Sequence, residues 1–172
     1  MILVGLTKKL QDKSKIKIES LPEKFPSDLN SWHAHLFTQS RKSGVIIMND
    51  LTRYSVILYG LKKADFQNLS ELFLNQLIEN MKADDFNETE IIKFTSDIDK
   101  LYFTKTSSRS ILGSINDCLH LIEWWVDDFA LLSGAVLTNL NKRINRSPML
   151  PLEKEGFDAF PRFALHEAIE RI

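Results

Sequence analysis

The spacing of apolar residues changes once along this sequence, close to residue 60. Before that point, short β-branched or aromatic runs alternate with polar residues, which is typical of strands. After it, apolar residues recur at intervals of three and four, which is typical of amphipathic helices. We therefore predict an α+β domain, in which an antiparallel sheet from the first part is packed against two or three helices on one face.

The predicted sheet combines N-terminal strands with a three-strand meander, and a later strand joins it. The stretch between Ser20 and Asn30 contains two prolines and is predicted to be a loop. Asn49 and Asp50 favour a turn inside the meander, because both side chains can bond nearby backbone amides. The predicted strands are Ile2–Leu6, Lys15–Ile18, Trp32–Thr38, Val45–Met48, Tyr54–Tyr59 and Leu101–Thr104.

The second part of the sequence predicts a series of helices. Asn87 is the expected N-cap of one of them, since asparagine favours that position. The predicted helices are Lys62–Met81, Glu88–Ile98, the central helix that begins near Arg109 and runs to Val126, Leu131–Ile144, and Arg162–Ile172. Residues 1–150 are expected to form a single α+β domain, and residues 151–172 a C-terminal tail with at most a short helix.

Composition excludes several classes of protein. A net charge of −1 argues against a general polyanion binder. Cys118 is the single cysteine, so neither an intrachain disulfide nor a multi-cysteine metal site can form. No apolar run reaches the roughly 20 residues that a membrane span needs. The N-terminus lacks the order of charged, apolar and small residues of a signal peptide, and we expect a cytoplasmic protein without membrane contact.

The stretch from Leu101 to Val126 is the most chemically suggestive part of the chain. A short strand leads through a polar hinge into the central helix, whose first amides and dipole favour an anion. The expected anion-binding residues are Lys105, Ser107, Ser108, Arg109 and Arg146. Arg109 lies in the first helical turn, where the dipole disfavours a cation unless an anion or an internal carboxylate, such as Asp50 or Asp117, compensates it.

A second group of polar residues gives an alternative, enzymatic hypothesis. This polar cluster consists of His33, Asp50, Asn116, Asp117 and Asn145. A small hydrolase or nuclease using His33, Asp50, Arg109 and Asp117 is one hypothesis. However, the G-x-S-x-G turn and the phosphate-loop pattern are both absent, so we assign no catalytic residue and lean away from an enzyme.

No metal or cofactor is expected. His33 and His35 form an H-x-H pair on a predicted strand, but a zinc site needs a third and usually a fourth protein ligand. The phosphate-loop and dinucleotide-binding patterns are both missing. The sequence therefore predicts no bound cofactor.

A third hypothesis is an interaction protein that forms a homo-oligomer. Trp124 and Trp125 are adjacent, and neighbours on a helix point about 100° apart. One of them is expected in the core, and the other on the surface as a partner contact. Across the three hypotheses, we favour a non-enzymatic binding module whose partner is a phosphate-bearing ligand, a nucleic acid or an acidic protein.

Several separate blocks of the sequence, in the same order, resemble an uncharacterised bacterial family, a domain of unknown function. The resemblance covers roughly residues 1–150 and implies no activity. Its blocks are Trp32-His33-Ala34, Asn49-Asp50-Leu51-Thr52, Leu61-Lys62-Lys63-Ala64-Asp65-Phe66, Lys105-Thr106 with Arg109-Ser110-Ile111-Leu112-Gly113-Ser114-Ile115-Asn116-Asp117, and Leu140-Asn141 with Asn145-Arg146-Ser147-Pro148-Met149.

Overall fold

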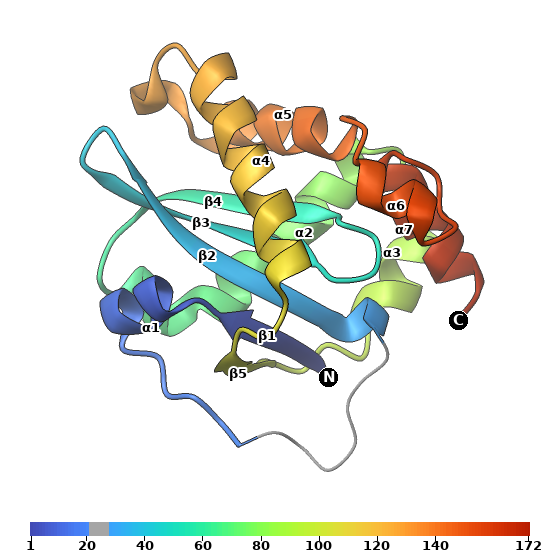
Figure 1. Ribbon diagram of the computed structural model, residues 1–172, viewed down its shortest axis with the longest axis horizontal. Helices are drawn as coiled ribbons and strands as arrows, with labels where there is room; N and C mark the ends of the chain where they lie inside the picture. The colour runs from blue at the N-terminus through green and yellow to red at the C-terminus, as the bar shows by residue number, and fades with distance from the viewer. Residues whose placement is uncertain (21–27) are drawn as a thin grey trace.

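A five-stranded open sheet forms the centre of the protein, and helices lie on both of its faces (Figure 1). The structure is a computed structural model that describes residues 1–20 and 28–172. The loop predicted between Ser20 and Asn30 lies mostly outside the described residues. Its last part, Asp28–Asn30, is a turn of 3-10 helix (η1) that leads into the sheet.

The predicted strands and helices after residue 30 are confirmed, with ends that shift by a few residues. The strands are β1 (Ile2–Leu6), β2 (Ser31–Gln39), β3 (Lys42–Asn49), β4 (Ser55–Leu61) and β5 (Leu101–Lys105). The helices are α1 (Lys8–Ser14), α2 (Leu69–Ala83), α3 (Glu88–Thr95), α4 (Arg109–Trp125), α5 (Gly134–Asn145), α6 (Leu150–Lys154) and α7 (Pro161–Glu170). Short 3-10 turns precede α2 (η2, Asp65–Asn68) and α5 (η3, Phe129–Leu131). Asn87 caps α3 as predicted, in a reciprocal capping box with Glu90.

The prediction of an antiparallel sheet is wrong for its N-terminal part, because the sheet is mixed. The strand order is β4-β3-β2-β1-β5. The meander β2-β3-β4 is antiparallel as predicted, but β1 pairs in parallel with both β2 and β5. Each parallel pairing requires the chain to cross over the sheet before it returns, and no local pattern in the sequence records such a crossover.

The prediction that helices cover one face of the sheet is also wrong. Val45, Ile47 and Val56 face a core that contains Phe73 of α2. The residues between them in the strands, Ile46 among them, face a second core under α4 and α5. Figure 1 shows α4 in front of the sheet and α2 behind it. Burial on both faces explains why these strands have unbroken apolar runs.

The N-terminal region differs from the prediction at one further point. Lys15–Ile18 does not form a strand, since Lys15 adopts a left-handed conformation (φ 56°) that ends α1. Ile16 and Ile18 still pack against the core, and Glu19 donates one backbone hydrogen bond of 2.8 Å to Phe103 in β5. The alternation of isoleucine and lysine therefore reflects one buried and one exposed side of an unpaired segment.

The C-terminal region contributes to both cores. Leu165, Ala168 and Ile169 of α7 are buried on the α2 side of the sheet. Leu152 of α6 and Ala164 are buried on the α4 side. None of the helices in the described ranges is long and apolar enough to cross a membrane.

Two asparagines of α5 cover the free edge of the sheet. The side chain of Asn145 accepts a hydrogen bond from the amide of Ser55 (2.7 Å) and donates one to its carbonyl (2.9 Å). Asn141 binds Ile57 of β4 in the same way, at 2.7 and 3.1 Å. Residues four apart on a helix share a face, and residues two apart on a strand share an edge, so the two side chains replace a neighbouring strand.

We expect Asn145→Ala to lower the free energy of unfolding by on the order of 2–4 kcal/mol, because it leaves two buried backbone groups of Ser55 without a partner. Denaturant melts measure this change. Asn139→Ala is the matched control on the exposed side of the same helix, and it should change stability by less than about 0.5 kcal/mol. Equal effects of the two substitutions would contradict the role of Asn145 as an edge cap.

Candidate functional site

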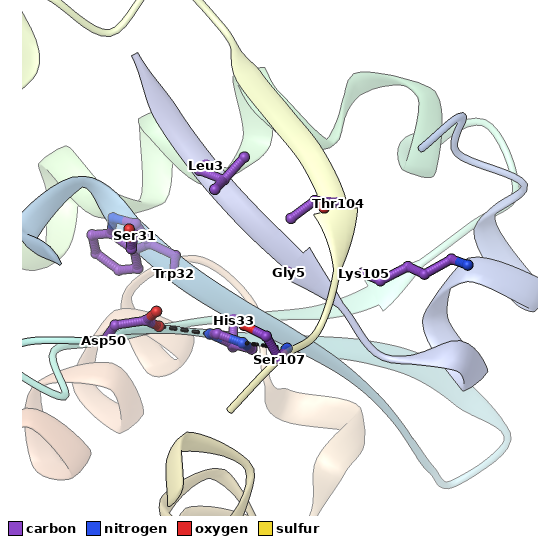
Figure 2. Close-up of a pocket in the computed structure, with 9 residues that line it drawn as sticks. All are labelled: Leu3, Gly5, Ser31, Trp32, His33, Asp50, Thr104, Lys105 and Ser107. Carbon is purple, nitrogen blue, oxygen red and sulfur yellow. Dashed lines mark hydrogen bonds and ion pairs between the residues drawn. The ribbon is translucent and has the colours of Figure 1, made fainter. Parts of the chain in front are cut away.

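The imidazole of His33 lies between the sheet and the N-terminus of α4. Its Nδ1 is 2.7 Å from Oδ1 of Asp50, and its Nε2 accepts hydrogen bonds from the amides of Ser107 (3.2 Å) and Ser108 (3.3 Å). Figure 2 shows His33 between Asp50 and Ser107. A carboxylate can only accept and an amide can only donate, so these partners place the imidazole proton on Nδ1.

Gly5 of β1 makes room for this ring. A Cβ atom at this position would lie 3.0 Å from Cδ2 and Nε2 of His33 and 3.2 Å from Cα of Thr106. The pairing of β1 with β2 places Gly5 beside His33, and the pairing with β5 brings the start of the α4 connection over it. A side chain at this position would therefore require His33 or the chain at Thr106 to shift, and glycine avoids that shift.

The Asn49–Thr52 turn holds Asp50 in place. The side-chain oxygen of Asn49 accepts hydrogen bonds from the amides of Leu51 (3.2 Å) and Thr52 (2.9 Å), and from the Thr52 hydroxyl (2.9 Å). Its amide group donates to the carbonyl of Leu29 at 2.6 Å. This buried side chain fixes the turn from inside, so that the carboxylate of Asp50 points at His33.

A small cavity opens beside His33, and we call it the His33 pocket. Its volume is about 130 Å³. Three hydroxyl residues from different elements, Ser31, Thr104 and Ser107, line it together with Lys105 (Figure 2). The full lining is Leu3, Gly5, Ser31, Trp32, His33, Asp50, Thr104, Lys105 and Ser107. The side chain of Lys105 lies at the rim, where it is exposed and extends away from His33.

A larger cleft of about 480 Å³ lies on the other side of Asp50. Arg53, Ser108, Ser110 and Glu155 contribute to its lining. The guanidinium of Arg53 is almost fully buried and donates from Nη2 to Oε1 of Glu155 at 2.8 Å. Its Nε and Nη1 groups have no hydrogen-bond partner within the described part of the chain. The lining of this cleft therefore contains both acidic and basic side chains, and its arginine already forms an ion pair with Glu155.

The N-terminus of α4 is partly satisfied from within the protein. The hydroxyl of Ser108 caps the helix by accepting from the amide of Ile111 at 3.3 Å. Arg109 is exposed, and no carboxylate of residues 1–20 or 28–172 lies within ion-pair distance of it. The internal salt bridge weighed for Arg109 is thus not formed with any described carboxylate.

The structure brings together half of the residues that the sequence singled out. Five of them lie at the His33 pocket or at the start of α4: His33, Asp50, Lys105, Ser107 and Ser108. Asn116 and Asp117 lie further along α4 on its exposed side.

Asn145 and Arg146 belong to a different part of the molecule. Asn145 caps β4, as described above. Arg146 donates to Asp84 (3.0 Å) and Asp85 (2.9 Å). Burial raises the pKa of Asp84, while its bonds to Arg146 and to the hydroxyl of Tyr54 act in the opposite direction. This buried network explains the position of Arg146 without any ligand.

The sequence did not single out Gly5, Ser31, Thr104 or Arg53. Gly5 and Thr104 reach the site only through the parallel pairing of β1 with β2 and β5, for which the sequence has no local signal, whereas Ser31 precedes His33 by two residues on β2. For Arg53 the sequence has a weak signal, its position directly after the Asn49–Thr52 turn, and the structure shows that it has a left-handed backbone (φ 58°). A charged residue that ends a turn in this conformation is uncommon.

Thiolate attack and metal binding find little support in the described part of the structure. Burial raises the pKa of the Cys118 thiol to about 12, so this cysteine is not a thiolate nucleophile. Within the described residues, no group of three or more His, Cys, Asp or Glu side chains is arranged to hold a metal ion. The site offers hydroxyl and amide donors, one imidazole and one carboxylate.

A comparison with known protein families identifies the chain at family level. The model of the family described as Domain of unknown function (DUF6933) matches residues 3–160. The chain belongs to this family. The match confirms the resemblance to a family of unknown function, and it extends past residue 150 into α6. No curated protein and no solved structure matches the chain.

We expect Gly5→Ala to lower the free energy of unfolding by roughly 1–3 kcal/mol, because the new methyl group would displace His33 or the chain at Thr106. Gly113→Ala in the middle of α4 is the matched control, since a Cβ atom there would meet nothing within 4 Å. This control should raise stability by about 0.5–1 kcal/mol through helix propensity. Thermal or denaturant melts compare the two, and an unchanged Gly5→Ala protein would contradict the close packing of His33.

Proposed function

We propose that this member of the family is a binding module for a small anion, such as the phosphate group of a ligand, in the His33 pocket. The observation that carries the proposal is the lining of that pocket. Three hydroxyl residues line a cavity of about 130 Å³ beside the N-terminus of a 17-residue helix, and Lys105 stands at its rim. Hydroxyls, an ammonium group and a helix N-terminus are the groups that proteins use to hold phosphate.

The start of α4 supports an anion beside this position, and one carboxylate opposes it. Asp50 is hydrogen-bonded to the neutral His33 ring at 2.7 Å, which orients the carboxylate but leaves its negative charge in place. The amides of Arg109 and Ser110 donate to no acceptor found among the described residues. Arg109 is exposed next to them on the first turn of α4, outside the lining of the pocket. An anion at the start of α4 would also offset the unfavourable interaction between the Arg109 guanidinium and the helix dipole.

The hydrolase hypothesis rests on the His33–Asp50 pair, and the geometry supports it less well. A general base must offer a free lone pair within hydrogen-bond reach of the proton that it removes. Nε2 of His33 accepts two amide hydrogen bonds instead, and its side chain is only 5% exposed. Neither Asp117 nor Arg109 is among the residues that line the pocket. The pair acts better as a support for α4 than as a catalytic dyad.

Thermal melts in phosphate and in chloride at equal ionic strength test anion binding. At ten times the dissociation constant, phosphate should stabilise the unmodified protein by about 1.4 kcal/mol, which corresponds to roughly 3–6 °C. Lys105→Ala and Arg109→Ala should each reduce this shift and leave the anion-free melting temperature unchanged, because both side chains are exposed. Lys154→Ala, at an exposed position on α6, is the control. A melting temperature that phosphate does not raise would refute the proposal.

Self-association is a second candidate function, which one observation favours. The side chain of Trp124 is 81% exposed, whereas its neighbour Trp125 packs under Arg143 at 4.0 Å. Leu131, on the turn after α4, is also largely exposed. Exposed tryptophans are frequent anchors of protein interfaces.

If Trp124 anchors a homo-oligomer, light scattering should show a multiple of the 19.9 kDa chain mass. Trp124→Ala should then shift the protein to the monomer, because a buried interface anchor typically contributes about 2 kcal/mol or more. Leu150→Ala, which removes another highly exposed apolar side chain, should leave the mass unchanged. A monomer at all concentrations would count against self-association.

A further inference from the structure

Six cationic side chains meet at the end of the sheet opposite to the Asn49–Thr52 turn. They line one cavity of about 560 Å³, which we call the basic cleft. They come from three segments that are far apart in the sequence: Lys13 and Lys15 at the end of α1, Arg41 and Lys42 at the β2–β3 turn, and Lys62 and Lys63 after β4.

These segments are held together by the fold. The side chain of Gln67 in η2 donates to the carbonyl of Ser14 in α1 at 3.3 Å. Figure 1 shows α1 beside the chain that leaves β4. The arrangement of the cations is therefore a property of the tertiary structure.

The charges of the basic cleft are not compensated by the protein. No acidic side chain is among its lining residues, and none of its six cations takes part in an ion pair within the described ranges. The carboxylate of Asp65 is nearby in sequence, but it accepts from the backbone amide of Lys62 at 2.6 Å. The whole chain has 22 basic and 23 acidic residues, so this concentration does not follow from composition. Repulsion between such cations favours a bound anion.

A β-bulge and two left-handed backbone conformations occur in the segments that carry these cations. Gly60 (φ 77°) is the extra residue of a β-bulge, where Ser43 pairs with Leu61 and Gly44 pairs with Tyr59. A bulge bends its strand, and this one precedes Lys62 and Lys63 by two and three residues. Lys15 (φ 56°) and Arg41 (φ 62°) adopt left-handed conformations that favour glycine or asparagine. Their charged side chains are therefore not explained by the turns in which they lie.

From this geometry we infer that the basic cleft binds a small ligand with several linked phosphate groups, an oligophosphate. Six cations exceed what a single phosphate can neutralise, and five of them are lysines, which act as point charges for phosphate. The volume falls in the range of small-molecule sites. The one aromatic residue in the lining, Phe66, is only 2% exposed, so the cleft lacks the stacking surface that single-stranded nucleic acids use.

Calorimetric titration with tripolyphosphate tests this inference on the full chain. Binding should weaken on the order of tenfold between 50 and 200 mM salt, because it is electrostatic. Lys62→Ala/Lys63→Ala should weaken it by at least about tenfold. Lys82→Ala/Lys154→Ala removes the same charge from two exposed positions outside the cleft and should have no effect. Arg41→Gly should also weaken binding, and its fold is retained because glycine suits the left-handed turn.

The site and the class of ligand are each open to refutation. No binding of tripolyphosphate, or binding that Lys62→Ala/Lys63→Ala leaves unchanged, would overturn the inference. A single-stranded oligonucleotide that binds more tightly than tripolyphosphate would overturn the ligand class in favour of nucleic acid. Lys105→Ala separates the basic cleft from the His33 pocket: it should affect only binding at that pocket, so the tripolyphosphate binding that Lys62→Ala/Lys63→Ala weakens should persist, and its loss would assign the ligand to the His33 pocket instead.

Discussion

The hydrogen bonds of one buried imidazole connect most of the elements on the α4 side of the sheet. His33 belongs to β2, binds the turn between β3 and β4 through Asp50, and binds the connection from β5 to α4 through two amides. It also packs on Gly5 of β1. A neutral imidazole has one donor and one acceptor on opposite sides of a rigid ring, so it can satisfy a carboxylate and a helix N-terminus at once. The start of α4 therefore has a fixed position over the sheet.

The requirement that buried polar groups find hydrogen-bond partners also governs the free edge of the sheet. Backbone groups that leave water must find partners, and β4 has no neighbouring strand on its outer side. Asn141 and Asn145 supply side-chain amides with the donor and acceptor of a peptide group. Asn80 then donates to Asn141 at 2.9 Å, which joins the edge cap to α2. These buried polar side chains fix the position of α5 against β4 and α2, and they have no solvent-facing surface for a ligand.

Charge is distributed unevenly between the two ends of the sheet. At the end that holds the Asn49–Thr52 turn, Arg53 forms an ion pair with Glu155, and Asp50 is hydrogen-bonded to His33. At the opposite end, the basic cleft gathers cations without acidic partners in its lining. A chain of net charge −1 can therefore still present a strongly positive surface over a small area. Net charge limits non-specific binding to polyanions, but it does not describe a single cleft.

Local patterns in the sequence were sufficient for most of the secondary structure. The alternation in β2, the period of α2 and α4, and the cap at Asn87 each depend on residues only a few positions apart. The same reasoning placed Lys105, Ser107 and Ser108 beside a helix N-terminus. The failed strand at Lys15–Ile18 marks the limit of this approach, because alternation reports burial of one side and not backbone pairing.

The sequence by itself thus determined the α+β class, the antiparallel meander and the polar start of α4. Only the tertiary structure decided that β1 lies between β2 and β5, which brings Gly5 and Thr104 to His33. It also decided that Asn145 and Arg146 belong to the β4 edge and a buried ion pair, and that six distant cations share one cleft. The physical reason is the same in each case: these contacts join residues separated by tens of positions, and the free energy that selects them comes from packing the whole chain.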